Sequence, residues 1–222
     1  MRLLPCLLLA ALAASPLRAA SIQDTVFEAH LFDGISEPQT LLYRYEIGGS
    51  LLGQTGEAQV QMQVREVGED GLKQVHFDMF KGPQRRHFGP VQAQDNNPLV
   101  LIFLQRDVAQ MGNLTGASPG YFRNRLREAM LRPAEVAPLT VELDGAPVDA
   151  LEVTIAPFEN DPNAAQFEQF RHKRYRLVVS DAVPGGLYRI ASETPDPDGK
   201  ILLEESMTFA SLAPPVAPGT EP

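Results

Sequence analysis

Apolar and glutamine side chains alternate without interruption along Ala58-Gln59-Val60-Gln61-Met62-Gln63-Val64. Successive side chains of a β-strand point to opposite faces of its sheet. This segment therefore predicts a strand that buries Val60 and Met62, with its glutamines on an exposed face.

The alternation continues on both sides of this segment, over residues 21 to about 92. Residues 41–47 and 75–79 repeat it clearly, and Gly-rich stretches separate the runs. Residues 27–31 show a shorter version, which predicts a further strand with His30 on its polar side. Such a series is typical of an antiparallel meander with one solvated face.

The periodicity changes at Asn97-Pro98, where Asn suits a helix N-cap and Pro the first helical position. The helix that follows is apolar on every side at its start, and Gly112 is its expected end. Ser118-Pro119 starts a second helix in the same way, which ends at Pro133. We expect a helical hairpin near residues 97–132.

Strands resume over residues 139–143 and 151–155, a short helix is expected after Asp161-Pro162, and three more strands reach Phe209. One apolar sheet face needs a covering layer. The predicted fold is therefore α+β: a strongly curved antiparallel β-sheet, or half-barrel, with the helical hairpin and the short helix packed on its concave face. It forms a single domain over residues 21–209.

Two terminal segments fall outside that domain. Residues 1–20 have a basic start, an apolar run and small residues near position 19, and this order predicts a cleaved secretory signal peptide. Cys6 precedes the apolar run, which argues against a lipoprotein signal, and cleavage removes this only cysteine. Residues 210–222 are Pro-rich and predict a disordered tail. We expect a periplasmic protein.

The charge balance limits the classes of partner. The chain carries 19 basic and 28 acidic residues, a net charge of −9, and removal of Arg2 and Arg18 gives 17 − 28 = −11. Nucleic acid and anionic lipid surfaces repel such a chain unless its basic residues gather locally. After residue 20, no apolar run approaches the roughly 18 residues of a membrane span.

Catalytic and metal-binding motifs are weak. Gly116-Ala117-Ser118-Pro119-Gly120 matches G-x-S-x-G, with Asp161 and His172 following in the order of a serine hydrolase. Pro119, however, has no N–H for an oxyanion, so Ser118 is interpreted as a helix cap. The four histidines lack metal-ligand spacing, and residues 196–199 are interpreted as a hairpin turn rather than a calcium loop. We expect no enzyme activity, cofactor or metal.

Three segments resemble one family. Leu41–Gly53 is similar to its opening strand pair, the helix from Pro98 to its mid-chain helix, and Tyr175–Ile190 to its strand, Pro-bearing loop and strand. The family consists of uncharacterised exported bacterial proteins that share the half-barrel fold of periplasmic lipoprotein-localisation factors. Membership implies a periplasmic location and a lipid or lipoprotein ligand, without assigning any functional residue.

Two hypotheses of function remain open. In the first, a non-catalytic binding protein holds a lipid, acyl chain or other apolar ligand on its concave face, unless the same residues are simply packed core. In the second, an interaction module of an envelope assembly binds an anion or a protein partner through basic clusters. The candidate ligand-binding residues are Tyr43, Tyr45, Val60, Met62, Phe77, Met79, Leu101 and Phe103, and the candidate anion or partner residues are Arg85, Arg86, Arg171, Lys173, Arg174 and Arg176.

Overall fold

The computed structural model describes residues 21–52 and 55–216, so the predicted signal peptide and the end of the predicted tail lie outside the described residues. The described residues form one nine-stranded antiparallel sheet in the order β4-β3-β2-β1-β9-β8-β7-β6-β5. Its strands are β1 (Gln39–Gly48), β2 (Gly56–Val67), β3 (Lys73–Met79), β4 (Arg86–Ala93), β5 (Glu135–Leu143), β6 (Ala146–Ile155), β7 (Arg174–Val179), β8 (Leu187–Pro195) and β9 (Ile201–Ala213).

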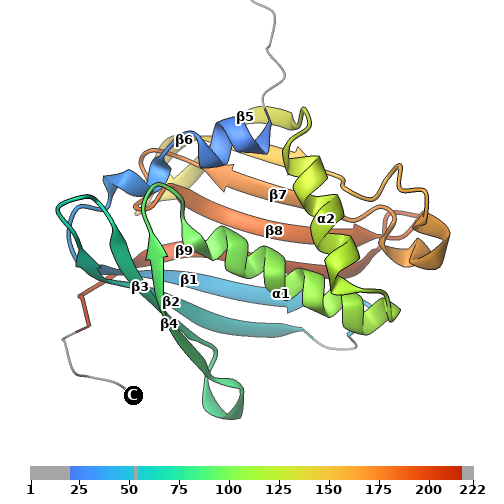
Figure 1. Cartoon of the computed structure of the whole chain (residues 1–222), viewed down its shortest axis with the longest axis horizontal. Helices are drawn as coiled ribbons and strands as arrows, with labels where there is room; N and C mark the ends of the chain where they lie inside the picture. The colour runs from blue at the N-terminus through green and yellow to red at the C-terminus, as the bar shows by residue number, and fades with distance from the viewer. Residues whose placement is uncertain (1–20, 53–54, 217–222) are drawn as a thin grey trace, which may run out of the picture.

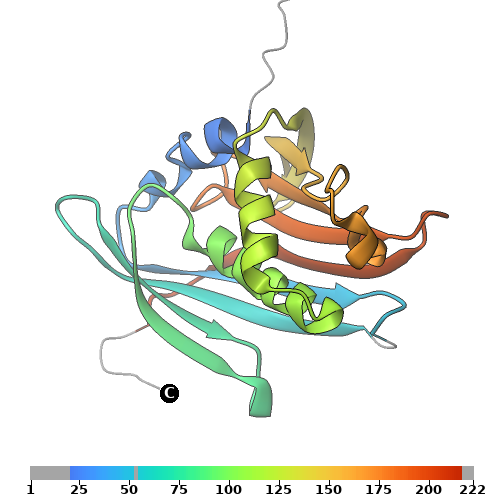
Figure 2. The ribbon, with the colours of Figure 1, turned by 45° about the vertical axis from the view of Figure 1, so that its right-hand side comes forward.

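The sheet consists of two meanders that meet at its centre. Strands β1–β4 form the first and β5–β9 the second, and β1 pairs with β9 across the middle, with Tyr43 opposite Phe209. Between the meanders the chain forms α1 (Pro98–Thr115) and α2 (Pro119–Met130). The sheet curves around α1, and α2 crosses the β7–β8 side (Figures 1 and 2). The predicted α+β half-barrel is confirmed.

Helix α1 begins where the sequence predicts and ends later. The Asn97 side chain accepts a hydrogen bond from the Leu99 N–H at 3.1 Å, which caps the helix. Gly112 does not end the helix, because Gly116 adopts the left-handed conformation, at φ 71°, that stops it. Gly112 instead lets α2 approach closely: a Cβ there would lie 2.9 Å from Cγ of Pro119.

Aromatic rings hold α2 against the loop that follows β6. Phe122 packs edge-on against Phe158 and Phe167, with ring centroids 5.7 and 5.5 Å apart. That loop contains two short 3-10 turns, η4 (Ala164–Gln166) and η5 (Glu168–Phe170), where the sequence predicts one short helix. Ser118 occupies the N-cap position of α2, but its side chain makes no capping hydrogen bond.

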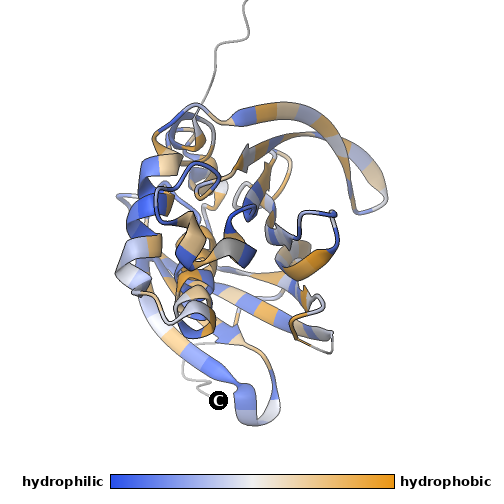
Figure 3. Cartoon of the chain, turned by 90° about the vertical axis from the view of Figure 1, so that its right-hand side faces the viewer, coloured by the Kyte–Doolittle hydropathy of each residue, from blue (hydrophilic) through white to orange (hydrophobic). Residues whose placement is uncertain are grey.

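Three further expectations from the sequence are wrong. Residues 27–31 form no strand, because the chain turns through η1 (Gln23–Phe27) and η2 (Leu31–Gly34), with His30 between them at φ 51°. The predicted tail begins too early, since β9 extends to Ala213. The glutamine row is not an open face: Gln63 is only 5% exposed. It donates to Gln61 and accepts from Arg65, in a ladder along β2. Figure 3 shows the alternating hydropathy of the strands.

Candidate functional site

The residues predicted to hold an apolar ligand lie in the packed core. Seven of the eight are at most 4% exposed: Tyr43, Tyr45, Val60, Met62, Phe77, Met79 and Phe103. They belong to one hydrophobic cluster with the inner face of α1, which includes Leu99 and Met111. Leu101 is 51% exposed and faces away from this cluster, so it does not line the concave face. Ligand binding by the other seven stays a prediction.

The predicted basic patch is divided among different surroundings. Arg85 pairs with Asp78, with 2.8 Å between Nε and Oδ1, and Arg176 pairs with Glu193 at 3.3 Å. Lys173 is buried and does not reach the surface. The other three side chains are exposed and have no ion-pair partner among the described residues: Arg86, Arg171 and Arg174.

Lys173 belongs to a buried polar cluster beneath α1. Its Nζ lies 2.7 Å from Oδ1 of Asp107, and neither side chain is exposed. Asp107 also accepts hydrogen bonds from the hydroxyls of Tyr175 at 2.5 Å and Ser192 at 3.1 Å. Burial and the Asp107 charge raise the pKa of Tyr175 well above its usual value. The cluster therefore fixes α1 to β7 and β8 through a charge with three partners.

The preceding residue of α1 makes a second polar contact with the sheet. Nε of Arg106 lies 2.6 Å from Oε1 of Glu205, whose side chain is fully buried. The guanidinium also lies over the rings of Tyr45 and Phe80, 4.9 and 5.0 Å from their centroids. Burial raises the pKa of Glu205, and the neighbouring Arg106 opposes this shift. The charged groups of both contacts, Arg106–Glu205 and Lys173–Asp107, are paired with each other inside the domain. They therefore stabilise the position of α1, and a ligand site on the surface must use other residues.

A hollow of about 670 Å³ lies at the end of α1. We call it the rim groove. Its walls come from the end of α1, the η4–η5 loop and the β8–β9 hairpin, which adjoin at one end of the sheet (Figure 1). The lining residues are Leu114, Thr115, Gln166, Phe167, Gln169, Arg171, His172, Pro195, Asp196, Pro197 and Leu202.

The rim groove combines apolar side chains with one arginine. Leu114 is 44% exposed, and Leu202 and the buried Phe167 line the same hollow. Arg171 is exposed and has no ion-pair partner in the described chain, and His172 lies beside it. The carboxylate of Asp196 is directed into its own turn, where it accepts from the N–H groups of Asp198 and Lys200. The groove thus offers an apolar surface beside one free positive charge.

A second large hollow has the opposite character. It occupies about 530 Å³ over the ends of β1, β2, β8 and β9. Five glutamates line it, Glu46, Glu57, Glu193, Glu204 and Glu205, and Arg189 is its one cationic side chain among the described residues. This acidic surface is unsuited to an apolar or anionic molecule.

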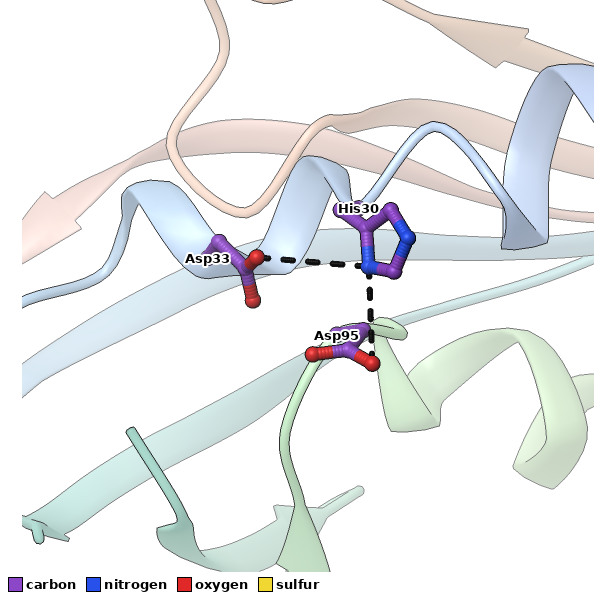
Figure 4. Close-up of side chains that lie close together, drawn as sticks. All are labelled: His30, Asp33 and Asp95. Atoms are coloured by element: carbon purple, nitrogen blue, oxygen red, sulfur yellow. Dashed lines mark ion pairs between the residues drawn. The ribbon is translucent and has the colours of Figure 1, made fainter. Parts of the chain in front are cut away.

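One histidine, His30, lies close to two carboxylates, and the sequence did not predict this cluster. Nδ1 of His30 lies 3.4 Å from Asp95 and 4.0 Å from Asp33 (Figure 4). One donor atom from each residue falls within 4.8 Å of the others. These donors suit a divalent metal ion. The side chains of His30 and Asp33 are more than half exposed, however, and their ion pairs account for the arrangement, so we assign no metal.

The residues of the hydrolase-like motif are engaged elsewhere. Asp161 accepts a hydrogen bond from the Tyr121 hydroxyl and lies 2.9 Å from Nε of Arg125. It therefore anchors α2 to the loop after β6. His172 lines the rim groove, whose lining does not include Ser118.

Comparisons with known proteins give resemblances at the level of the fold. No family model matches the chain, and no curated protein does. Among solved structures, the Pseudomonas aeruginosa MucA/MucB complex contains a similar chain at 13% identity and a TM-score of 0.42; the match covers 87% of this chain and 57% of that one.

Two further structures are more distant. The Mycobacterium tuberculosis lipoprotein LppX is 10% identical over 86% of this chain and 94% of its own, with a TM-score of 0.35. A LolA superfamily protein from Nitrosomonas europaea is 10% identical over 90% and 96%, with a TM-score of 0.29. The resemblance to lipoprotein-localisation folds is therefore loose. Among the described residues, no helix is both long and apolar enough to cross a bilayer.

Proposed function

We propose that this chain is a non-catalytic periplasmic binding protein that holds the acyl part of a lipid or a similar amphiphile in its rim groove. The observation that carries the proposal is the groove itself, which places the exposed Leu114 and the partly exposed Leu202 beside an arginine with no ion-pair partner in the described chain. Apolar walls with a few placed polar groups are typical of sites for small amphiphilic molecules.

The groove is a better candidate than the concave face, because that face is already filled. Side chains of α1 and the sheet pack there at low exposure, and an entering acyl chain would have to displace them. The pairs Lys173–Asp107 and Arg106–Glu205 would also have to separate before α1 could move. The groove needs no such opening, since Leu114 is already accessible.

The cationic side of the groove favours an amphiphile with a negative end. Arg171 is free to meet a carboxylate or a phosphate, and a guanidinium binds either group through paired hydrogen bonds. The alternative function, a partner surface made of the whole set of basic residues, has less support. Three members of that set are paired internally: Arg85, Lys173 and Arg176.

The test is the binding of a fluorescent fatty acid to delipidated chain of residues 21–222. Leu114→Gln should reduce the affinity about ten-fold, because it replaces apolar wall by a polar group without adding a charge that could bind the acid. Leu101→Gln is the matched control, since Leu101 is a similarly exposed leucine of the same helix outside the groove lining. Its affinity should equal that of the unsubstituted chain.

Arg171→Gln supplies the second arm of the test. It should weaken the binding of the fatty acid and leave an uncharged acyl alcohol probe unaffected, because only the acid presents an anionic end. Equal binding by the unsubstituted chain and the Leu114 variant would refute the assignment to the groove. Loss of binding in the Leu101 variant alone would point to the outer side of α1.

A further inference from the structure

The outward side of α2 is exposed along its whole length. Arg123, Arg127 and Leu131 follow one another at four-residue spacing, which places them on one side of the helix. The opposite side carries Phe122 and Leu126, which are buried in the core. Leu131 directly follows the helix and is 66% exposed, the largest fraction among the exposed large apolar side chains of the described residues.

This side is basic in a chain that is acidic overall. Residues 119–132 contain four arginines and one glutamate, a local charge of +3 against −9 for the whole chain. Glu128 pairs with Arg125 and Arg132, at 2.9 and 3.6 Å. Arg123 has no ion-pair partner in the part of the chain that the structure describes, and Arg127 contacts only the Asn124 side chain, at 2.7 Å. The basic residues have thus gathered locally, the condition under which an acidic chain binds an anionic surface.

The far end of α2 lies where the N-terminal segment joins the domain. Ser21 forms an isolated β-bridge with Pro133, two residues beyond Leu131. The first described residues lie beside this end of the helix in both views (Figures 1 and 2). Asp24 of η1 accepts a hydrogen bond from the Ser21 N–H at 2.9 Å.

We propose that the outward side of α2, formed by Arg123, Arg127, Leu131 and Arg132, is a docking surface for a bilayer that contains anionic phospholipid. Arginines near such a surface are attracted to its headgroups, and an exposed leucine beside them enters the headgroup region. We infer a lipid surface as the partner because three arginines complement anionic headgroups and the exposed Leu131 beside them offers an apolar side chain to the bilayer. This inference uses residues outside the rim groove and does not rest on the proposed function.

The test is co-sedimentation of the chain of residues 21–222 with vesicles. Binding to phosphatidylglycerol–phosphatidylethanolamine vesicles should exceed binding to phosphatidylcholine vesicles and fall as salt is added. The triple variant Arg123→Gln, Arg127→Gln, Arg132→Gln should bind the anionic vesicles roughly 100-fold more weakly, which corresponds to about five-fold for each arginine.

The matched control changes the same charge elsewhere. Arg44, Arg86 and Arg174 are exposed residues of β1, β4 and β7, and their replacement by Gln lowers the net charge by the same three units. This control should keep the affinity within about two-fold of the unsubstituted chain. Equal weakening by both triple variants would show a general charge effect and overturn the proposal, as would equal binding to both kinds of vesicle.

A reporter at Leu131 makes the test independent of the triple variant's folding. The chain has no tryptophan, so Leu131→Trp introduces the only indole fluorophore. Its emission should shift to shorter wavelength with anionic vesicles, because the ring leaves water. An unchanged spectrum in the presence of sedimenting vesicles would place the contact elsewhere and refute the assignment to α2.

Discussion

Replacement of Lys173 by Met tests whether the buried ion pair fastens α1 to the sheet. The substitution keeps most of the side-chain volume and removes the charge that faces Asp107 at 2.7 Å, with both side chains fully buried. A buried charge that loses its partner costs about 3–5 kcal/mol of stability. Because Tyr175 and Ser192 still donate to Asp107, we expect the lower end, about 3 kcal/mol.

The assay is equilibrium unfolding in urea at neutral pH, followed by circular dichroism. With a denaturant dependence of about 2 kcal/mol per molar urea, a loss of about 3 kcal/mol lowers the midpoint by about 1.5 M. The control is Arg176→Met, which removes a partly exposed pair between Arg176 of β7 and Glu193 of β8. An exposed pair contributes at most about 1 kcal/mol, so this midpoint should fall by less than about 0.5 M.

A combined variant distinguishes the cost of leaving Asp107 without its partner from the effect of removing the whole Lys173–Asp107 pair. Asp107→Leu, Lys173→Met, Tyr175→Phe and Ser192→Ala together remove both charges and both hydroxyls that donate to Asp107. Apolar replacement of a whole buried pair is often neutral or stabilising, so this variant should recover to within about 1 kcal/mol of the unsubstituted chain. Equal midpoints for the Lys173 and Arg176 variants, or a combined variant less stable than Lys173→Met, would refute the reasoning.

Two further substitutions test other contacts of the helices. Because the pKa of Glu205 is raised, the folded chain holds this proton more tightly than the unfolded chain. The contribution of Glu205 to stability is therefore greatest at low pH and decreases as the pH rises above about 4.5. The difference in unfolding free energy between the unsubstituted chain and Glu205→Gln, measured in urea from pH 4 to 7, should therefore decrease with pH; a rising difference would mean that Arg106 dominates. Gly112→Ala should lower the free energy of unfolding by about 1–3 kcal/mol in thermal unfolding, because its Cβ would meet Pro119. Gly120→Ala, whose Cβ would have its nearest contact at 3.4 Å, should lower it by less than about 1 kcal/mol. Equal losses would contradict the close packing of the helices.

The elements with long, regular patterns could be predicted from the sequence. The alternation through Val60 and Met62 gave the buried face of β2, and Asn97-Pro98 gave the start of α1. The strand predicted over residues 27–31 was wrong, because an alternation of only five positions also fits a chain that turns and buries Val26 and Phe32. Over such a short run, local pattern does not distinguish a strand from two consecutive turns.

The surroundings of the candidate site residues could not be predicted, because they depend on contacts between residues far apart in the sequence. Leu101 lies in a run that is apolar on every side, so periodicity gave no indication of which side faces solvent. Lys173 stands in a basic run typical of a solvated surface, and its partner Asp107 precedes it by 66 positions. The rim groove joins three separate segments, and only their positions in the fold bring Leu114, Arg171 and Leu202 together.

The pairing of β1 with β9 has a consequence for how the chain is made. Thr40 lies opposite Ala213, so the central seam of the sheet joins residues from the two ends of the domain. Translation proceeds from one end, and the first meander therefore keeps an open edge at β1 until β9 is present to pair with it. Completion of the sheet is a late event, and removal of the last strand would divide one domain into two unsupported meanders.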